Sequence, residues 1–168
     1  MLLTAYTRSP FIRGNNSAQG LALYSRTFNI VKEHCGAAQS IYLHGFGGRA
    51  SDVTGWVAHV PKCYFCFTAA VRHFSVEQTL GLKQVPNNII LVETDSPYLS
   101  SNMQVSLNRP ALIGDVAELV AARRMVNLPD FWQSRLRTPA IFISSAKGLA
   151  WGEVPMSAWN SVSRPVYN

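Results

Sequence analysis

Short apolar runs alternate along the chain with longer segments in which apolar and polar positions recur at helical spacing. The apolar runs are too short for helices and end at glycine, proline or polar residues, which predicts strands. We expect strands at residues 40–46, 62–68 and 89–94, and a fourth at either 2–6 or 9–12. We expect helices at residues 20–35, 49–60 and 75–85 and from Pro110 onward, the last being the longest amphipathic helix.

Strands that alternate with helices are typical of βαβ units and therefore of a parallel sheet. The expected strands are apolar along their whole length, which indicates that both faces of the sheet are covered. From residue 145 onward, serine, glycine, tryptophan and proline follow one another without a period. We therefore expect one α/β domain over residues 1–144 and an irregular tail over residues 145–168.

Polar residues stand at the carboxyl ends of two expected strands. Glu93 and Asp95 share one strand face with Leu91, and His44 comes at the end of the strand at 40–46. The carboxyl ends of parallel strands meet at the edge where α/β proteins place their chemistry. An imidazole and a carboxylate at this edge suit a divalent metal ion, which could activate water or polarise a phosphoryl oxygen.

Two purely structural explanations fit the same residues. A backbone carbonyl near the glycine-rich loop at 45–48 would satisfy His44. A helix cap or an Asx-turn ahead of Pro97 would explain Glu93 and Asp95. Periodicity does not distinguish these explanations from a metal site.

Charge and cysteine content indicate which kind of partner and which cellular compartment to expect. The net charge of +6 favours anionic partners such as nucleic acid, although a solvated basic surface gives the same composition. No run approaches the ~20 apolar residues of a membrane-spanning helix. Three cysteines without a secretion signal indicate an intracellular protein, cytoplasmic or nuclear. Cys63 and Cys66 have CxxC spacing but lie on opposite faces of the expected strand, so we interpret them as structural.

Three segments resemble the TatD-type DNases, which are metal-dependent nucleases built on amidohydrolase-like TIM barrels. The most specific is ETDSPYL at 93–99, which resembles the C-terminal signature of that family. YLHGFGG at 42–48 resembles its H-C-F-x-G segment, and Asn108-Arg-Pro110 resembles its N-x-P segment. The resemblance covers residues 13–142 and implies a partial TIM (β/α) barrel made of the later strands and helices.

The resemblance also implies roles for individual residues. His44 matches a metal ligand of the family, and Asp95 matches the catalytic aspartate that binds metal and helps to activate the attacking water. Glu93 is expected to support these ligands without binding the ion itself. The implied cofactor is Mg²⁺, Mn²⁺ or Zn²⁺, and the implied substrate is DNA. Further candidates are Arg72 and Arg109 for substrate phosphates and His73 as a substitute ligand.

The sequence departs from the family pattern at several ligands. No H-x-H pair occurs, and no residue can be assigned to the glutamate from the middle of the barrel. The histidine that precedes a C-R or S-R pair aligns either with Phe11, in the segment 10–14, or with Tyr24, in the segment 23–26; we prefer the first. Two of the family's ligands therefore remain.

A complete barrel needs about 250 residues, so this chain corresponds to the second half of one. Its open sheet edges would be covered by self-association or by a partner chain. We expect a TatD-related hydrolase of DNA phosphodiester bonds that is truncated and weakly active or inactive as this chain. The alternatives are a non-catalytic binding protein on the same scaffold and an enzyme that hydrolyses a small ester or amide.

Overall fold

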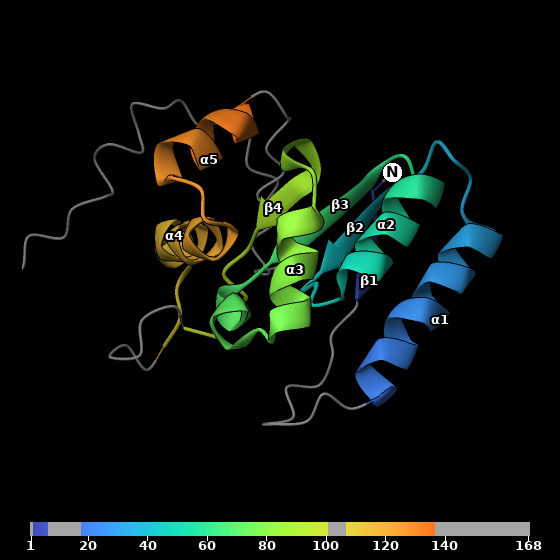
Figure 1. Ribbon diagram of the computed structural model, residues 1–168, viewed down its shortest axis with the longest axis horizontal. Helices are drawn as coiled ribbons and strands as arrows, with labels where there is room; N and C mark the ends of the chain where they lie inside the picture. The colour runs from blue at the N-terminus through green and yellow to red at the C-terminus, as the bar shows by residue number, and fades with distance from the viewer. Residues whose placement is uncertain (1, 7–17, 101–106, 137–168) are drawn as a thin grey trace, which may run out of the picture.

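The computed structural model describes residues 2–6, 18–100 and 107–136 (Figure 1). Four strands are present: β1 (Leu2–Tyr6), β2 (Ser40–His44), β3 (Cys63–Phe67) and β4 (Ile90–Val92). The α-helices are α1 (Ala18–His34), α2 (Ala50–His59), α3 (Val76–Gln84), α4 (Ile113–Arg124) and α5 (Leu128–Leu136). Short 3₁₀ helices are η1 (Ala69–His73), η2 (Asn87–Ile89) and η3 (Pro110–Leu112).

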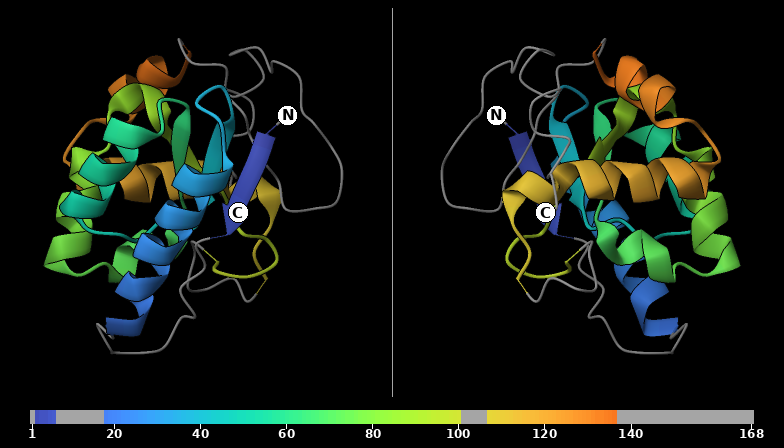
Figure 2. Two further views of the ribbon diagram at one scale, coloured as in Figure 1. Left: turned by 90° about the vertical axis from the view of Figure 1, so that its right-hand side faces the viewer. Right: turned by 90° about the vertical axis from the view of Figure 1, so that its left-hand side faces the viewer.

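The four strands form one parallel sheet in the order β1-β2-β3-β4, so that each strand lies beside the next one along the chain. Tyr6 is in register with His44, Leu43 with Phe65, and Phe67 with Val92. Helices α1, α2 and α3 connect successive strands and lie together on one side of the sheet (Figures 1 and 2). This consecutive winding is that of a TIM barrel, whereas an open doubly wound sheet reverses its strand order.

The two faces of the sheet have different neighbours. One face packs on the helices and forms the main core, which includes Ile41, Phe65 and Ile90 from the strands and Trp56 and Val120 from the helices. The opposite face carries a smaller buried cluster of Tyr42, Cys66 and Leu91, with Tyr64 packed against it. On this second face, the residues at the carboxyl ends of the strands form the candidate site.

Local signals in the sequence determine where the helices begin. Ser75 caps α3 in a reciprocal pair: its Oγ accepts a bond from the Gln78 amide at 3.3 Å, and its own amide donates to Gln78 Oε1 at 3.0 Å. Asp52 performs the second half of such a pair at the start of α2, where it accepts a bond from the Arg49 amide at 2.7 Å. These bonds satisfy amides that have no partner within the helix.

Helices α2 and α3 depend on a close backbone approach at Gly81. A Cβ atom at this position would lie 2.4 Å from the carbonyl oxygen of Gly48, which belongs to the loop after β2. No side chain can be accommodated at that distance unless the backbone moves. The absence of a side chain at Gly81 therefore allows α3 to lie against the loop that follows His44.

Most of the predicted elements are confirmed with shorter bounds. The fourth strand is Leu2–Tyr6, the first of the two predicted positions. The prediction that the helix near Pro110 is the longest is wrong, because α1 has 17 residues and α4 has 12. Cys63 and Cys66 lie in different clusters on opposite faces of β3, as expected. The predicted boundary at residue 144 and the tail at 145–168 lie outside the described residues.

The structure also bears on membrane association. Within the described segments, every helix is too short or too polar to cross a membrane.

Candidate functional site

The candidate site forms where β2 and β4 end. His44 is the last residue of β2 and has the same orientation as Tyr42 on the face opposite the helices. Glu93 follows β4 directly, and its amide donates to the Phe67 carbonyl at 2.9 Å, which continues the pairing of β4 with β3. Asp95 lies two residues further along. Parallel pairing therefore brings the ends of β2 and β4 to one edge, on either side of β3.

The imidazole of His44 lies between the carboxylates of Glu93 and Asp95. Nδ1 is 2.6 Å from Glu93 Oε2, and Nε2 is 3.3 Å from Asp95 Oδ1. The three residues are only 7%, 3% and 8% exposed, respectively. Charged groups at this level of burial require partners, and here each carboxylate has the imidazole as a counter-charge.

The surroundings of His44 change its acidity. Burial alone lowers the pKa of an imidazole, because it disfavours the charged form. Hydrogen bonds from His44 to Asp95 and Glu93, with the negative charges of both, outweigh burial and raise its pKa from 6.5 to about 9. The ring is therefore an imidazolium at neutral pH when nothing but these side chains surrounds it.

Glu93 is the most highly connected residue of the site. Its Oε2 accepts a bond from the Tyr42 hydroxyl at 2.6 Å in addition to the contact with His44, and its Oε1 accepts one from the Gly45 amide at 2.8 Å. The Cys66 thiol lies in the same buried cluster as Tyr42. Burial and the nearby charge of Glu93 raise the pKa of this thiol, so it stays protonated. Both carboxylate oxygens of Glu93 are thus engaged with groups on β2 or directly after it.

The loop that carries Asp95 is held by Asn108. Asp95 has a left-handed backbone with a φ of 58°, an arrangement that aspartate adopts more readily than most residues. The Asn108 side chain is buried, and its Nδ2 donates to the carbonyls of Thr94, Tyr98 and Leu99. A single amide therefore binds the loop on both sides of Asp95. The sequence identified Asn108 as part of a motif, but only the structure gives its contacts.

The donor atoms can be compared with the needs of a divalent ion. Nitrogen and oxygen ligands about 2.1 Å from a tetrahedral zinc ion lie roughly 3.4 Å apart. The 3.3 Å between His44 Nε2 and Asp95 Oδ1 fits two such ligands. Glu93 contacts Nδ1 on the other side of the ring, so it cannot join them. Among the described residues, no group of three His, Cys, Asp or Glu residues is arranged to hold an ion.

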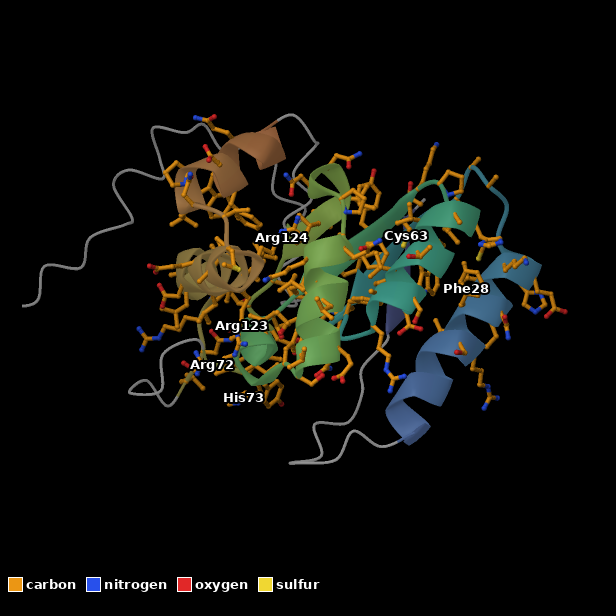
Figure 3. All side chains as sticks on the ribbon, in the orientation of Figure 1. Phe28, Cys63, Arg72, His73, Arg123 and Arg124 are labelled. Atoms are coloured by element: carbon orange, nitrogen blue, oxygen red, sulfur yellow. The ribbon has the colours of Figure 1, made fainter. Side chains whose placement is uncertain are left out.

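The remaining predicted residues lie on short 3₁₀ helices or directly before one. Arg72 and His73 are on η1, which follows β3, and Arg109 is the exposed residue that precedes η3. Arg123 reaches from α4 to donate to the Arg72 carbonyl, and Figure 3 shows these side chains gathered around η1. The roles expected for Arg72, His73 and Arg109 remain predictions.

The two positions predicted for the lost histidine remain predictions. Tyr24 lies within α1, and Phe11 lies outside the described residues. On β1, the residue in register with His44 is Tyr6. In the sequence Tyr6 is followed by Thr7-Arg8, which is close to the family's S-R pair.

The sequence matches a known protein family over the segment that carries this site. A family model described as TatD related DNase matches residues 22–136. The chain belongs to this family. The resemblance inferred from the motifs is thereby confirmed, and the match lies within the segment 13–142 on which they fall.

Individual proteins are similar to this TatD-family chain over part of their length. A putative deoxyribonuclease of Xenopus laevis, tatdn3-B, is 31% identical over 104 residues, which cover 62% of this chain and 38% of the relative. A TatD family hydrolase from Entamoeba histolytica superimposes with a TM-score of 0.55 at 18% identity, covering 66% of this chain and 44% of that one. An uncharacterized amidohydrolase from Saccharomyces cerevisiae gives a TM-score of 0.50 at 15% identity, covering 61% and 39%.

At these identities the likeness to the two solved structures establishes the fold. The chain is α/β, with the parallel strands and helices of part of a TIM barrel, as predicted. It spans roughly two-fifths of the length of the TatD-family and amidohydrolase relatives that it matches.

Proposed function

We propose that this chain is the ion-binding, carboxyl-terminal part of a TatD-type hydrolase that cleaves phosphodiester bonds of DNA. The observation that carries the proposal is the 3.3 Å separation of His44 Nε2 and Asp95 Oδ1 at the carboxyl edge of the sheet. Family membership supplies the reaction class, and the net charge of +6 suits an anionic substrate.

Each residue of the site has a distinct role in this proposal. His44 and Asp95 would hold a divalent ion, Mg²⁺, Mn²⁺ or Zn²⁺, which when bound would polarise a phosphoryl oxygen and acidify water. The second oxygen of Asp95 would accept a hydrogen bond from the attacking water and orient it. Glu93 accepts a hydrogen bond from Nδ1–H of His44, so Nε2 is the nitrogen that would be available to bind the ion. Arg72 and Arg109 are proposed to contact substrate phosphates, with His73 as a substitute ligand.

We infer little or no nuclease activity for this chain by itself. Catalytic zinc sites use three protein ligands, and two-metal sites use more. His44 and Asp95 supply two, so further ligands would come from residues outside the described segments, from a second copy or from a partner chain. Such an arrangement would also cover the outer edges of β1 and β4.

A non-catalytic binding protein on the same scaffold is the second candidate function. It is compatible with the finding that no group of three potential metal ligands converges within the described residues. Such a protein would retain the basic surface and the fold but would not bind metal.

Metal titration separates the two. We expect calorimetry with Mn²⁺ and Zn²⁺ to detect binding by the wild-type chain, and Asp95→Asn and His44→Gln each to weaken it at least tenfold. Glu118→Gln, an exposed acid on α4, serves as the matched control and should leave binding unchanged. A chain that binds neither ion would support the non-catalytic candidate.

Cleavage of DNA is tested by supplying the other half of the family's barrel. A polypeptide that contains the family's H-x-H strand and glutamate is mixed with this chain, and cleavage is followed with Mg²⁺ or Mn²⁺. We expect metal-dependent cleavage that Asp95→Asn abolishes. A mixture that binds metal yet cleaves only small esters would argue against a nuclease.

A further inference from the structure

We propose that Tyr42 is a positioning residue: its hydroxyl fixes the Glu93 carboxylate and, through it, the orientation of the His44 imidazole. The inference builds on the proposed function, because the orientation matters for presenting Nε2 beside Asp95. In the motif at 42–48, Tyr42 stands where the family often has a first histidine, and the resemblance gives the tyrosine itself no role. Its contacts nevertheless place it at the centre of the site.

Tyr42 and His44 donate to the same oxygen atom. The Tyr42 hydroxyl and His44 Nδ1 each lie 2.6 Å from Glu93 Oε2. The two residues are two positions apart on β2, so their side chains extend from the same face of the sheet. A carboxylate that reaches across from the end of β4 therefore meets both groups at once.

The carboxylate has little freedom once these bonds are made. Its second oxygen accepts the Gly45 amide at 2.8 Å, so donors from the end of β2 occupy both oxygens. His44 and Gly45 come from the end of β2, whereas Tyr42 lies two residues before His44 on the same strand. Its hydroxyl is a third donor to the carboxylate and shares Oε2 with His44 Nδ1, so it holds the oxygen to which the imidazole bonds.

The position of the ring depends on that oxygen. An imidazole can turn about its Cβ–Cγ bond, and the hydrogen bond made by one nitrogen decides which nitrogen faces the other side. With Glu93 fixed at Nδ1, Nε2 is the atom that lies beside Asp95. Tyr42 thus acts on Nε2 through two successive hydrogen bonds without touching Asp95.

Tyr42 is buried, so its hydroxyl needs a hydrogen-bond partner, and Glu93 is that partner. The residue is 2% exposed, and a buried tyrosine hydroxyl is costly unless it is hydrogen-bonded. A leucine or phenylalanine would fill the cluster formed with Cys66 and Leu91 without that requirement. Packing alone therefore does not account for a hydroxyl at this position.

Tyr64 provides a matched control for the experiment. It is in register with Tyr42 on the neighbouring strand and packs against the same cluster, but it is partly exposed. Tyr42→Phe and Tyr64→Phe each remove one hydroxyl from the same face of the sheet. A general loss of packing would affect both variants, whereas loss of the bond to Glu93 is confined to the first.

The test is NMR of chain labelled with ¹⁵N in its histidines, with chelator present. In the wild type we expect a slowly exchanging Nδ1 proton of His44, with a cross-relaxation peak to the Tyr42 hydroxyl proton. Tyr42→Phe should lose the slowly exchanging resonance, and Tyr64→Phe should retain it. An Nδ1 proton that exchanges at the wild-type rate in Tyr42→Phe would overturn the proposal.

This test depends neither on the stability of Tyr42→Phe nor on metal binding. The wild-type cross-peak requires no variant, so its absence overturns the proposal even where Tyr42→Phe is too unstable to study. The measurement also requires no metal. A chain that fails to bind Mn²⁺ or Zn²⁺ would refute the proposed function, while the resonances would still report whether Tyr42 orients His44.

Discussion

Nε2 of His44 lies 3.3 Å from Oδ1 of Asp95, although two helices and two strands, α2, β3, α3 and β4, separate the two residues along the chain. The contact exists because parallel strands end at the same edge and because Asp95 turns back in a left-handed conformation. On the other side of the ring, Glu93 completes a buried row of alternating charge. The contribution of this row to the free energy of unfolding can be measured without an activity assay.

Replacement of Glu93 by glutamine should destabilise the chain. The variant removes the negative charge beside Nδ1 and places an amide among donors from Tyr42 and Gly45. Breaking one side of a buried ion pair typically costs about 3–5 kcal/mol, and Asp95 retains part of the compensation, so we expect about 3 kcal/mol by urea unfolding. Glu118→Gln on the exposed side of α4 should change the free energy of unfolding by less than about 0.5 kcal/mol.

The stability of the metal-free chain should fall at alkaline pH. The folded-state pKa of His44 is about 9, above the unfolded value of 6.5, so the folded state holds its proton more tightly. The resulting stabilisation is fully present below about pH 6.5 and is lost as the pH rises through 9. Thermal unfolding with chelator should show this decline, and His44→Gln should lack it. Equal slopes for both chains would mean that another group is responsible.

Loss of the Asn108 side chain should loosen the loop that carries Asp95. Asn108→Ala leaves the carbonyls of Thr94, Tyr98 and Leu99 without their shared donor. An unsatisfied buried carbonyl costs about 1–3 kcal/mol, so we expect a loss of that order and faster amide hydrogen exchange over residues 94–99. Asn88→Ala, at an exposed position on η2, is the control. Unchanged exchange in the loop would show that Asn108 does not hold it.

Two glycine-to-alanine variants should have effects of opposite sign. A Cβ at Gly81 would lie 2.4 Å from the Gly48 carbonyl oxygen, whereas a Cβ at Gly55 on α2 meets no atom within 4 Å. We expect Gly81→Ala to destabilise the chain by about 1–3 kcal/mol through overpacking. Gly55→Ala should stabilise it by about 0.5–1 kcal/mol through higher helix propensity. Denaturant unfolding of both variants checks this, and a tolerated Gly81→Ala would contradict the close approach.

The sequence predicted the order of strands and helices well, because hydrophobic period and capping residues are local signals. Ser75 and Gln78 illustrate this, since their spacing alone predicted the start of α3. Alternation of side chains along a strand also placed Glu93 and Asp95 on one face. In the structure both carboxylates contact His44, although the metal-binding role remains a prediction.

Features that depend on contacts between strands could not be predicted in the same way. The register of Tyr6 with His44 is one example, because it is a property of the assembled sheet. The sequence places Tyr42 on the same strand face as His44, but only the 2.6 Å distance to Glu93 reveals the hydrogen bond of its hydroxyl. The hold of Asn108 on three carbonyls likewise depends on how a loop folds back on itself.

The charged row also governs how the sheet is assembled. Side chains alternate along a strand, so a shift of β4 by one residue would turn Glu93 and Asp95 toward the apolar core between the sheet and the helices. Thr94 would then face His44. That misalignment would strand two acids without a counter-charge, at a cost larger than any single apolar contact could recover. The three residues that are proposed to bind and support an ion therefore also favour the correct register of β4 in the sheet.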